Sequence, residues 1–134
     1  MIECEKSTVS LLENSILFIN VGGDQEFSLR DYKEIKLASI RLANKKAVFN
    51  LINLGDKTIP DKEAREACTK ETGDGCVKAE AIIVHSLGQR IVARHILKQK
   101  KKHIPVKLFT NIDKAKAWLG KIKNDLDVMS LQQN

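Results

Sequence analysis

The chain has 134 residues, the usual size of one domain, and a chain of this length can bury roughly two-thirds of its unfolded surface. Because 43% of the residues are hydrophobic and 30% are charged, with only seven glycines and two prolines, a disordered or collagen-like chain is excluded. The net charge of +6 favours anionic partners. No apolar run approaches the ~18 residues of a membrane span, and the first ten residues carry acids where a secretory signal would be apolar. We therefore expect a cytoplasmic protein.

Two antiparallel strands and a helix are predicted at the start of the chain. Thr8–Leu12 and Ile16–Val21 are short runs of β-favouring residues, and the three residues between them suit a hairpin turn. The segment Ser28–Asn44 then predicts an amphipathic helix. Ser28 can cap its first turn, and Asp31 places a carboxylate near the positive end of the helix dipole.

A strand and a second helix follow. Lys46–Leu54 is short and almost continuously apolar, as a buried parallel strand should be. A helix is expected to begin around Thr58–Asp61, since Pro60 is tolerated in a first turn. It continues to Glu71, and the glycines at 73 and 75 end it.

A third helix follows the strand predicted over Lys78–His85, and Ser86 can cap it. It is expected to run from residue 87 to about residue 101. The side chains expected to face the core are Leu87, Ile91, Val92 and Ile96. The outer side is expected to carry a basic stripe: Arg90, Arg94, Lys98 and Lys101. Because residues 81–112 contain no Asp or Glu, the stripe predicts a weak anion-binding surface, with a merely solvated helix face as the alternative.

The last strand and helix complete the pattern. Val106–Phe109 predicts the strand, and Thr110 is expected to cap the helix after it. That helix has an apolar stripe: Ile112, Ala115, Trp118, Leu119 and Ile122. Residues 125–134 lack a clear apolar face and are expected to fray.

The element order is therefore β-β-α-β-α-β-α-β-α, which predicts an α/β fold with a mixed, mostly parallel five-stranded sheet and four main helices. We expect one domain over residues 1–124. This order resembles the STAS domain of sulfate transporters and bacterial anti-sigma-factor antagonists, and more closely the small stand-alone bacterial SpoIIAA-like proteins. The resemblance covers about residues 8–120 and is carried by KAEAIIVHS (Lys78–Ser86), PVKLFT (Pro105–Thr110), AKAWL (Ala115–Leu119), and EAR (Glu63–Arg65) after the hydroxyl of Thr58.

The resemblance implies an interaction site at the start of the second helix. In anti-sigma antagonists a partner kinase phosphorylates a serine there, which changes the docking surface. This chain lacks the D-S-S/T-G motif, because the acceptor position falls on Ile59 or Pro60. Thr58 is the nearest hydroxyl, and we expect it to be the helix cap. The implied site therefore consists of Thr58, Asp61 and Arg65, without the phosphorylation switch.

No catalytic, cofactor or metal site is predicted. Cys68, Cys76 and His85 have spacings that fit no common zinc module, and the glycine pairs match no phosphate-binding loop. No nucleophile elbow of the G-x-S-x-G type is present. Three cysteines without a signal peptide indicate reduced thiols, and we expect at least one of them to be buried.

These observations predict a non-enzymatic regulatory or protein-interaction module of the STAS or SpoIIAA-like type, with an unidentified protein, or a second copy in a homodimer, as partner. The alternative is a carrier or sensor that holds a small molecule or lipid at the strand ends, where open α/β sheets bind ligands. A weaker alternative is non-specific binding of nucleic acid or an anionic surface through the basic helix. The scarcity of aromatic residues for base stacking counts against nucleic acid.

Overall fold

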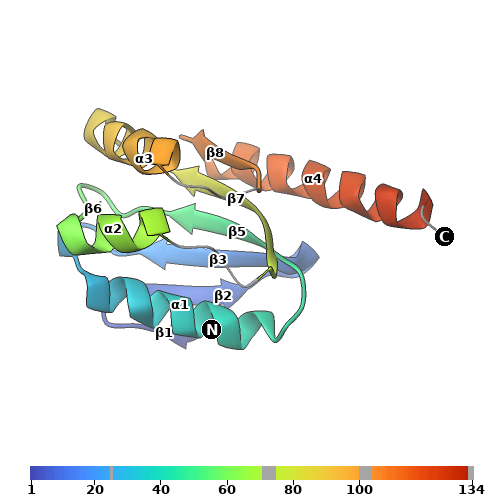
Figure 1. Ribbon diagram of the computed structural model, residues 1–134, viewed down its shortest axis with the longest axis horizontal. Coiled ribbons are helices and arrows are strands. Elements are labelled where there is room, and N and C mark those ends of the chain that lie inside the picture. The colour runs from blue at the N-terminus through green and yellow to red at the C-terminus, as the bar shows by residue number, and fades with distance from the viewer. Residues whose placement is uncertain (25, 71–74, 100–103, 133–134) are drawn as a thin grey trace.

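A six-stranded mixed sheet forms the centre of the molecule (Figure 1). The computed structural model describes residues 1–24, 26–70, 75–99 and 104–132. The strands lie in the order β1-β2-β3-β5-β7-β8, and their bounds are Ile2–Glu3, Ser7–Leu11, Ile16–Val21, Val48–Asn53, Val77–Ile83 and Val106–Phe109. The five predicted strands are all present, and the mixed, mostly parallel α/β sheet is confirmed. The hairpin β2–β3 is antiparallel, while β3, β5, β7 and β8 are parallel to one another.

Two features add to the predicted sheet. Strand β1 pairs antiparallel with β2 and becomes the sixth strand. A separate two-stranded sheet joins β4 (Glu26–Phe27) to β6 (Ile59–Pro60). Pro60 therefore lies in a short strand rather than in a helix. Proline is tolerated there because it has no backbone N–H to donate, and in an edge strand not every residue has to donate one.

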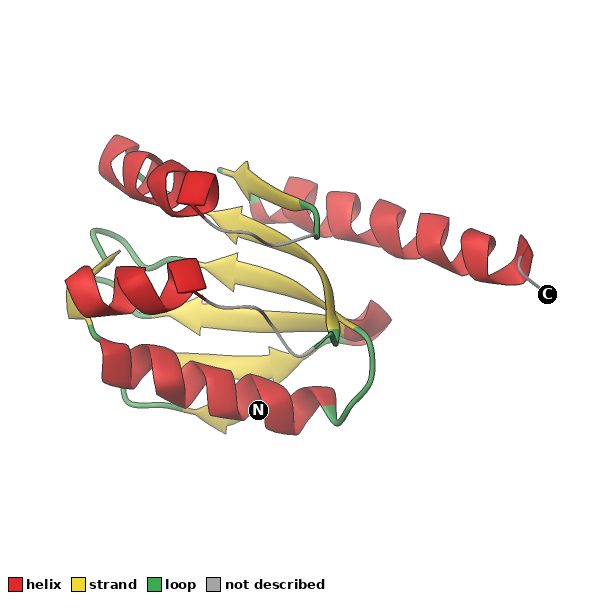
Figure 2. Cartoon of the chain, viewed as in Figure 1, coloured by secondary structure: helices red, strands yellow, loops and turns green. Residues whose placement is uncertain are grey.

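Within the described ranges, four α-helices cover the sheet: α1 (Leu29–Ala43), α2 (Lys62–Lys70), α3 (Leu87–Gln99) and α4 (Ile112–Gln132). Helices α1, α2 and α3 lie on one face and α4 on the other, as Figures 1 and 2 show. A one-turn 3₁₀ helix, η1 (Glu13–Ser15), makes the predicted turn between β2 and β3. The helix layers on both faces explain why β5 is mostly apolar, since a strand covered on both faces buries both sets of side chains.

Each face of the sheet has its own core. Under α1, buried side chains of β2, β3 and β5 pack against Ala38 and Ala43. Under α4, Phe49 and Leu51 of β5 and three residues of β7 pack against Ala115 and Leu119. The predicted apolar stripe of the last helix is confirmed, because Ala115 and Leu119 are fully buried and its other members pack around them.

The helix ends differ from the predictions in two places. Asn111, not Thr110, caps α4, because its Oδ1 accepts a hydrogen bond from the backbone N–H of Lys114 at 3.0 Å. The helix also continues through residues 125–132, where fraying was expected. An ion pair one turn apart, between Lys123 and Asp127 at 3.1 Å, supports this extension. The final turns project beyond the sheet (Figure 1) and bury little.

Candidate functional site

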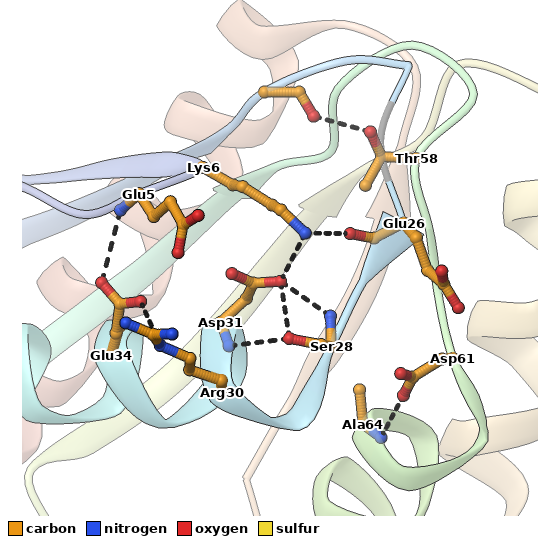
Figure 3. Close-up of polar contacts among 11 residues, drawn as sticks. Glu5, Lys6, Glu26, Ser28, Arg30, Asp31, Glu34, Thr58, Asp61 and Ala64 are labelled. Atoms are coloured by element: carbon orange, nitrogen blue, oxygen red, sulfur yellow. Dashed lines mark hydrogen bonds and ion pairs between the residues drawn. The ribbon is translucent and has the colours of Figure 1, made fainter.

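The segment Thr58–Arg65 is held by hydrogen bonds within the fold. Thr58 is 2% exposed, and its hydroxyl donates to the carbonyl of Gly22 at 2.6 Å. The prediction that Thr58 caps the second helix is therefore wrong, because α2 begins four residues later, after β6. Asp61 takes that role: its Oδ1 accepts from the backbone N–H of Ala64 at 2.9 Å (Figure 3).

Arg65, the third predicted site residue, also supports the local structure. Its Nη1 donates to the carbonyl of Pro60 at 2.9 Å, which ties the first turn of α2 to β6. Asp61 and Arg65 are both half-buried. The structure thus brings the two charged residues to the helix start, as expected, and places the Thr58 hydroxyl in the interior.

Gln89 joins this segment to α3, and the sequence analysis missed it. Its side chain is 2% exposed. Nε2 donates to the carbonyls of Gly55 at 2.7 Å and Thr58 at 3.0 Å, and Oε1 accepts from the backbone N–H of His85 at 2.7 Å. The S-x-x-Q spacing of Ser86 and Gln89 was the available signal, because this pattern marks a side chain that folds back onto the helix start.

The orientation of α3 differs from the prediction. Leu87 and Ile91, expected in the core, are 72% and 60% exposed. The inward positions are instead Gln89, Val92, Ala93, Ile96 and Leu97. Because Gln89 is anchored in the interior, α3 is rotated about its axis relative to the predicted orientation. Leu87 and Ile91, one turn apart on the other side of the helix, therefore face outward.

The outer stripe of α3 therefore combines apolar and basic side chains at helical spacing: Leu87, Ile91, Arg94 and Lys98. Arg94 and Lys98 are exposed, as predicted, whereas Arg90 is half-buried. Lys101, the last predicted member of the basic stripe, lies outside the described residues. A shallow depression beside the stripe is lined by His85, Ser86, Leu87 and Arg90, among others.

An acidic cluster near the start of α1 has a structural role. One carboxylate oxygen each from Glu5, Asp31 and Glu34 lies within 4.8 Å of the others. Asp31 is 4% exposed, and its Oδ2 accepts from the backbone N–H and hydroxyl of Ser28 and pairs with Lys6 at 3.1 Å (Figure 3). Lys6 also donates to the carbonyl of Glu26. These contacts complete the predicted cap of α1 and fasten the loop before β2 to the helix.

The Asp31 carboxylate makes a pH-dependent contribution to stability. Burial would raise the pKa of Asp31, but the hydrogen bonds from Ser28 and the charge of Lys6 outweigh it and hold the pKa below its usual value. We expect Asp31→Asn to lower the free energy of unfolding by about 1 kcal/mol at pH 7. Because the folded pKa is depressed, the difference from wild type should shrink as the pH falls below about 4.

Urea unfolding at pH 7 and pH 3 measures this difference. Asp127→Asn is the matched control, because Asp127 belongs to an exposed ion pair and its loss should change stability by less than about 0.5 kcal/mol. A gap between Asp31→Asn and wild type that is equally large at both pH values would show that the charge of Asp31 is not the source.

Three polar side chains, Asn20, Asn53 and His85, lie together at the carboxyl ends of the neighbouring parallel strands β3, β5 and β7. Asn53 donates through Nδ2 to Oδ1 of Asn20 at 2.9 Å, and Nε2 of His85 lies 2.9 Å from Oδ1 of Asn53. His85 is separated from Cys76, because His85 follows the carboxyl end of β7 and Cys76 precedes its amino end. The three cysteines all lie in the described part of the chain, form no disulfide there and are half-buried, so the expectation of at least one buried thiol is not met.

The interior between the sheet and α1, α2 and α3 contains a cavity of about 190 Å³. Its walls are mainly aliphatic, and the polar side chains among them include Ser39, Asn50 and Glu80. It lies beneath the three helices, whereas the ligand alternative from the sequence placed a pocket at the strand ends.

A membrane-spanning helix is not found in the described part of the chain, because each helix there is too short or too polar to cross a bilayer.

Comparisons with known proteins agree with this architecture. The model of a family described as a domain of unknown function, DUF7793, matches residues 10–123. No curated protein matches the chain in sequence. A similar solved structure is that of an uncharacterised protein of the DUF3478 family with a SpoIIAA-like fold, from Shewanella loihica PV-4. It is 18% identical, with a TM-score of 0.58 over 89% of this chain and 98% of that one. The resemblance to the SpoIIAA-like fold is therefore confirmed.

Proposed function

The chain belongs to the DUF7793 family, and on that premise we propose that it is a non-enzymatic interaction module that docks onto an acidic partner protein through the outer stripe of α3. The SpoIIAA-like fold supports a binding role. The segment Thr58–Arg65 remains in this proposal as the support of the docking helix, because Gln89 bonds the carbonyl of Thr58.

The observation that carries the proposal is the exposure of Leu87 and Ile91. They lie one turn apart on the first half of α3 and are 72% and 60% exposed. The helix has Val92, Ala93 and Ile96 to face the interior, so the fold does not need the outer pair. Adjacent exposed aliphatic side chains on a helix are typical of the apolar centre of a protein–protein contact.

Charge defines the partner. Arg94 and Lys98 continue the stripe toward the C-terminal end of α3, and residues 81–112 contain no acidic residue to neutralise them. A partner with an apolar centre and acidic surroundings complements this surface, because basic residues at the rim of an interface steer oppositely charged surfaces toward it. Nucleic acid fits less well, since the stripe offers aliphatic side chains where base stacking needs aromatic ones.

The double variant Leu87→Ser/Ile91→Ser tests the proposal. We expect it to remain folded and to bind the partner at least tenfold more weakly, because truncated central contacts typically cost more than about 1.4 kcal/mol together. Arg94→Glu/Lys98→Glu should weaken binding similarly and remove its salt dependence. The matched control is Leu37→Ser/Val128→Ser, which changes two aliphatic residues that are 70% and 52% exposed on other helices.

The measurement has two stages. Proteins captured from native extract by wild type and by each variant are quantified by mass spectrometry, and the Kd of the purified pair is then measured by calorimetry. An acidic protein that is lost with both α3 variants and retained with the control supports the proposal. Equal capture by all variants, or capture that nuclease treatment abolishes, contradicts it.

A further inference from the structure

The cavity between the sheet and helices α1–α3 has the dimensions of a small ligand site. Side chains of β3, β5 and β7 form one wall, and the three helices form the other. Its volume of about 190 Å³ exceeds that of engineered apolar cavities of about 150 Å³ that bind benzene. One or two fused aromatic rings therefore fit the space.

Two polar side chains of the sheet lie in the wall of this cavity. Asn50 on β5 and Glu80 on β7 are paired across the parallel register and are 7% and 5% exposed. Nδ2 of Asn50 donates to Oε2 of Glu80 at 3.1 Å. Such a pair interrupts the aliphatic surface of two central strands, where a valine or leucine would pack at no cost in desolvated polar groups.

The amide of Asn50 is only half satisfied. Among the described residues, none donates a hydrogen bond to its buried Oδ1. The hydroxyl of Ser39, on the helix side of the same cavity, is also buried and has no hydrogen-bond partner in the described part of the chain. Buried polar atoms in native proteins almost always have partners, so Oδ1 of Asn50 indicates a hydrogen-bond donor, and the Ser39 hydroxyl a donor or an acceptor, from outside the described residues.

The surroundings restrict the chemistry of that donor. The lining is mostly aliphatic, which favours an uncharged, largely apolar molecule. Burial raises the pKa of Tyr32, assisted by Cys68 and Glu80 nearby, so the phenol in the wall remains neutral. A ligand with several polar groups would leave most of them without partners.

We propose that this cavity binds a small aromatic molecule of one or two fused rings that carries one N–H or O–H group, donated to Oδ1 of Asn50. The ring fills the aliphatic space between the sheet and α1–α3, and the single donor satisfies the orphaned amide oxygen. The site uses other residues of α3 than the outer stripe, which lies on the opposite side of that helix.

Two probes of equal shape test the proposal on the full chain. Indole has a ring N–H, and benzofuran has the same ring system with an oxygen acceptor instead. Calorimetry and thermal unfolding with each probe should show that wild type binds indole roughly threefold to tenfold more tightly, the usual effect of one hydrogen bond to a buried neutral acceptor. Asn50→Leu should bind both probes equally.

A second variant keeps the test decisive if Asn50→Leu does not fold. Ser39→Leu replaces an unpartnered hydroxyl with a side chain that fills the cavity, so it should raise the thermal midpoint without ligand and abolish binding of both probes. Leu87→Ser/Ile91→Ser should bind indole like wild type. Equal binding of indole and benzofuran to wild type overturns the role of Asn50, and absence of indole binding at millimolar concentration overturns the site.

Discussion

Replacing Gly55 with alanine is expected to lower the free energy of unfolding by at least about 3 kcal/mol. A Cβ atom at this position would overlap the carbonyl carbon and oxygen of Gly22 and the backbone nitrogen of Gly23. All three are backbone atoms, so no flexible side chain can move aside. The loops after β3 and β5 would have to separate, and the hydrogen bond from Thr58 to the carbonyl of Gly22 would lengthen or break.

Gly120→Ala is the control for this prediction. A Cβ at Gly120 meets nothing within 4 Å, and the residue lies inside α4, where alanine is favoured over glycine. We expect it to raise the free energy of unfolding by about 0.5–1 kcal/mol. Urea unfolding followed by circular dichroism measures both variants. A Gly55→Ala protein as stable as wild type would show that the two loops do not approach this closely.

Replacing Gln89 with alanine is the other change with a large expected effect, a loss of about 3 kcal/mol. The buried amide satisfies two carbonyls, of Gly55 and Thr58, and one backbone N–H, of His85. Alanine leaves these groups without their partner in the interior and also leaves a void. Each unsatisfied buried group costs about 1–3 kcal/mol, and water that enters the void recovers part of that cost.

Gln99→Ala is the matched control, because Gln99 is exposed at the other end of α3 and contacts the side chain of His95. Its effect should stay within about 0.5 kcal/mol. Gln89→Glu separates the effect of the donated hydrogen bonds from that of side-chain volume, since glutamate fills the same space but cannot donate to the two carbonyls. Recovery of wild-type stability in Gln89→Glu would contradict the importance of the donated hydrogen bonds.

Features set by neighbouring residues were predictable from the sequence. The cap of α1 depends on Ser28 and Asp31, three residues apart, and it was predicted. The strand over β5 was predicted because two buried faces require a continuous apolar run. Sequence contributes little where partners are distant: Thr58 bonds Gly22, 36 residues away, and Gln89 bonds Thr58, 31 residues away.

The orientation of α3 was ambiguous for a different reason. Apolar residues occur almost all around this helix, so two overlapping faces satisfy the helical period and only the burial of Gln89 selects between them. Asn50 illustrates the same limit in a strand. Its position within an apolar run gives its face, but its pairing with Glu80 depends on the register between β5 and β7, which no local pattern encodes.

Helix α3 presents one side to the cavity and the other to solvent. If both proposed sites are occupied in the cell, their equilibria meet in this single element. Whatever factor a molecule bound in the cavity applies to the affinity of α3 for the docked protein, the docked protein must apply the same factor to the affinity of the cavity for that molecule. The tether from Gln89 to Gly55 and Thr58 limits how far the helix can move, and so sets an upper bound on that reciprocal effect.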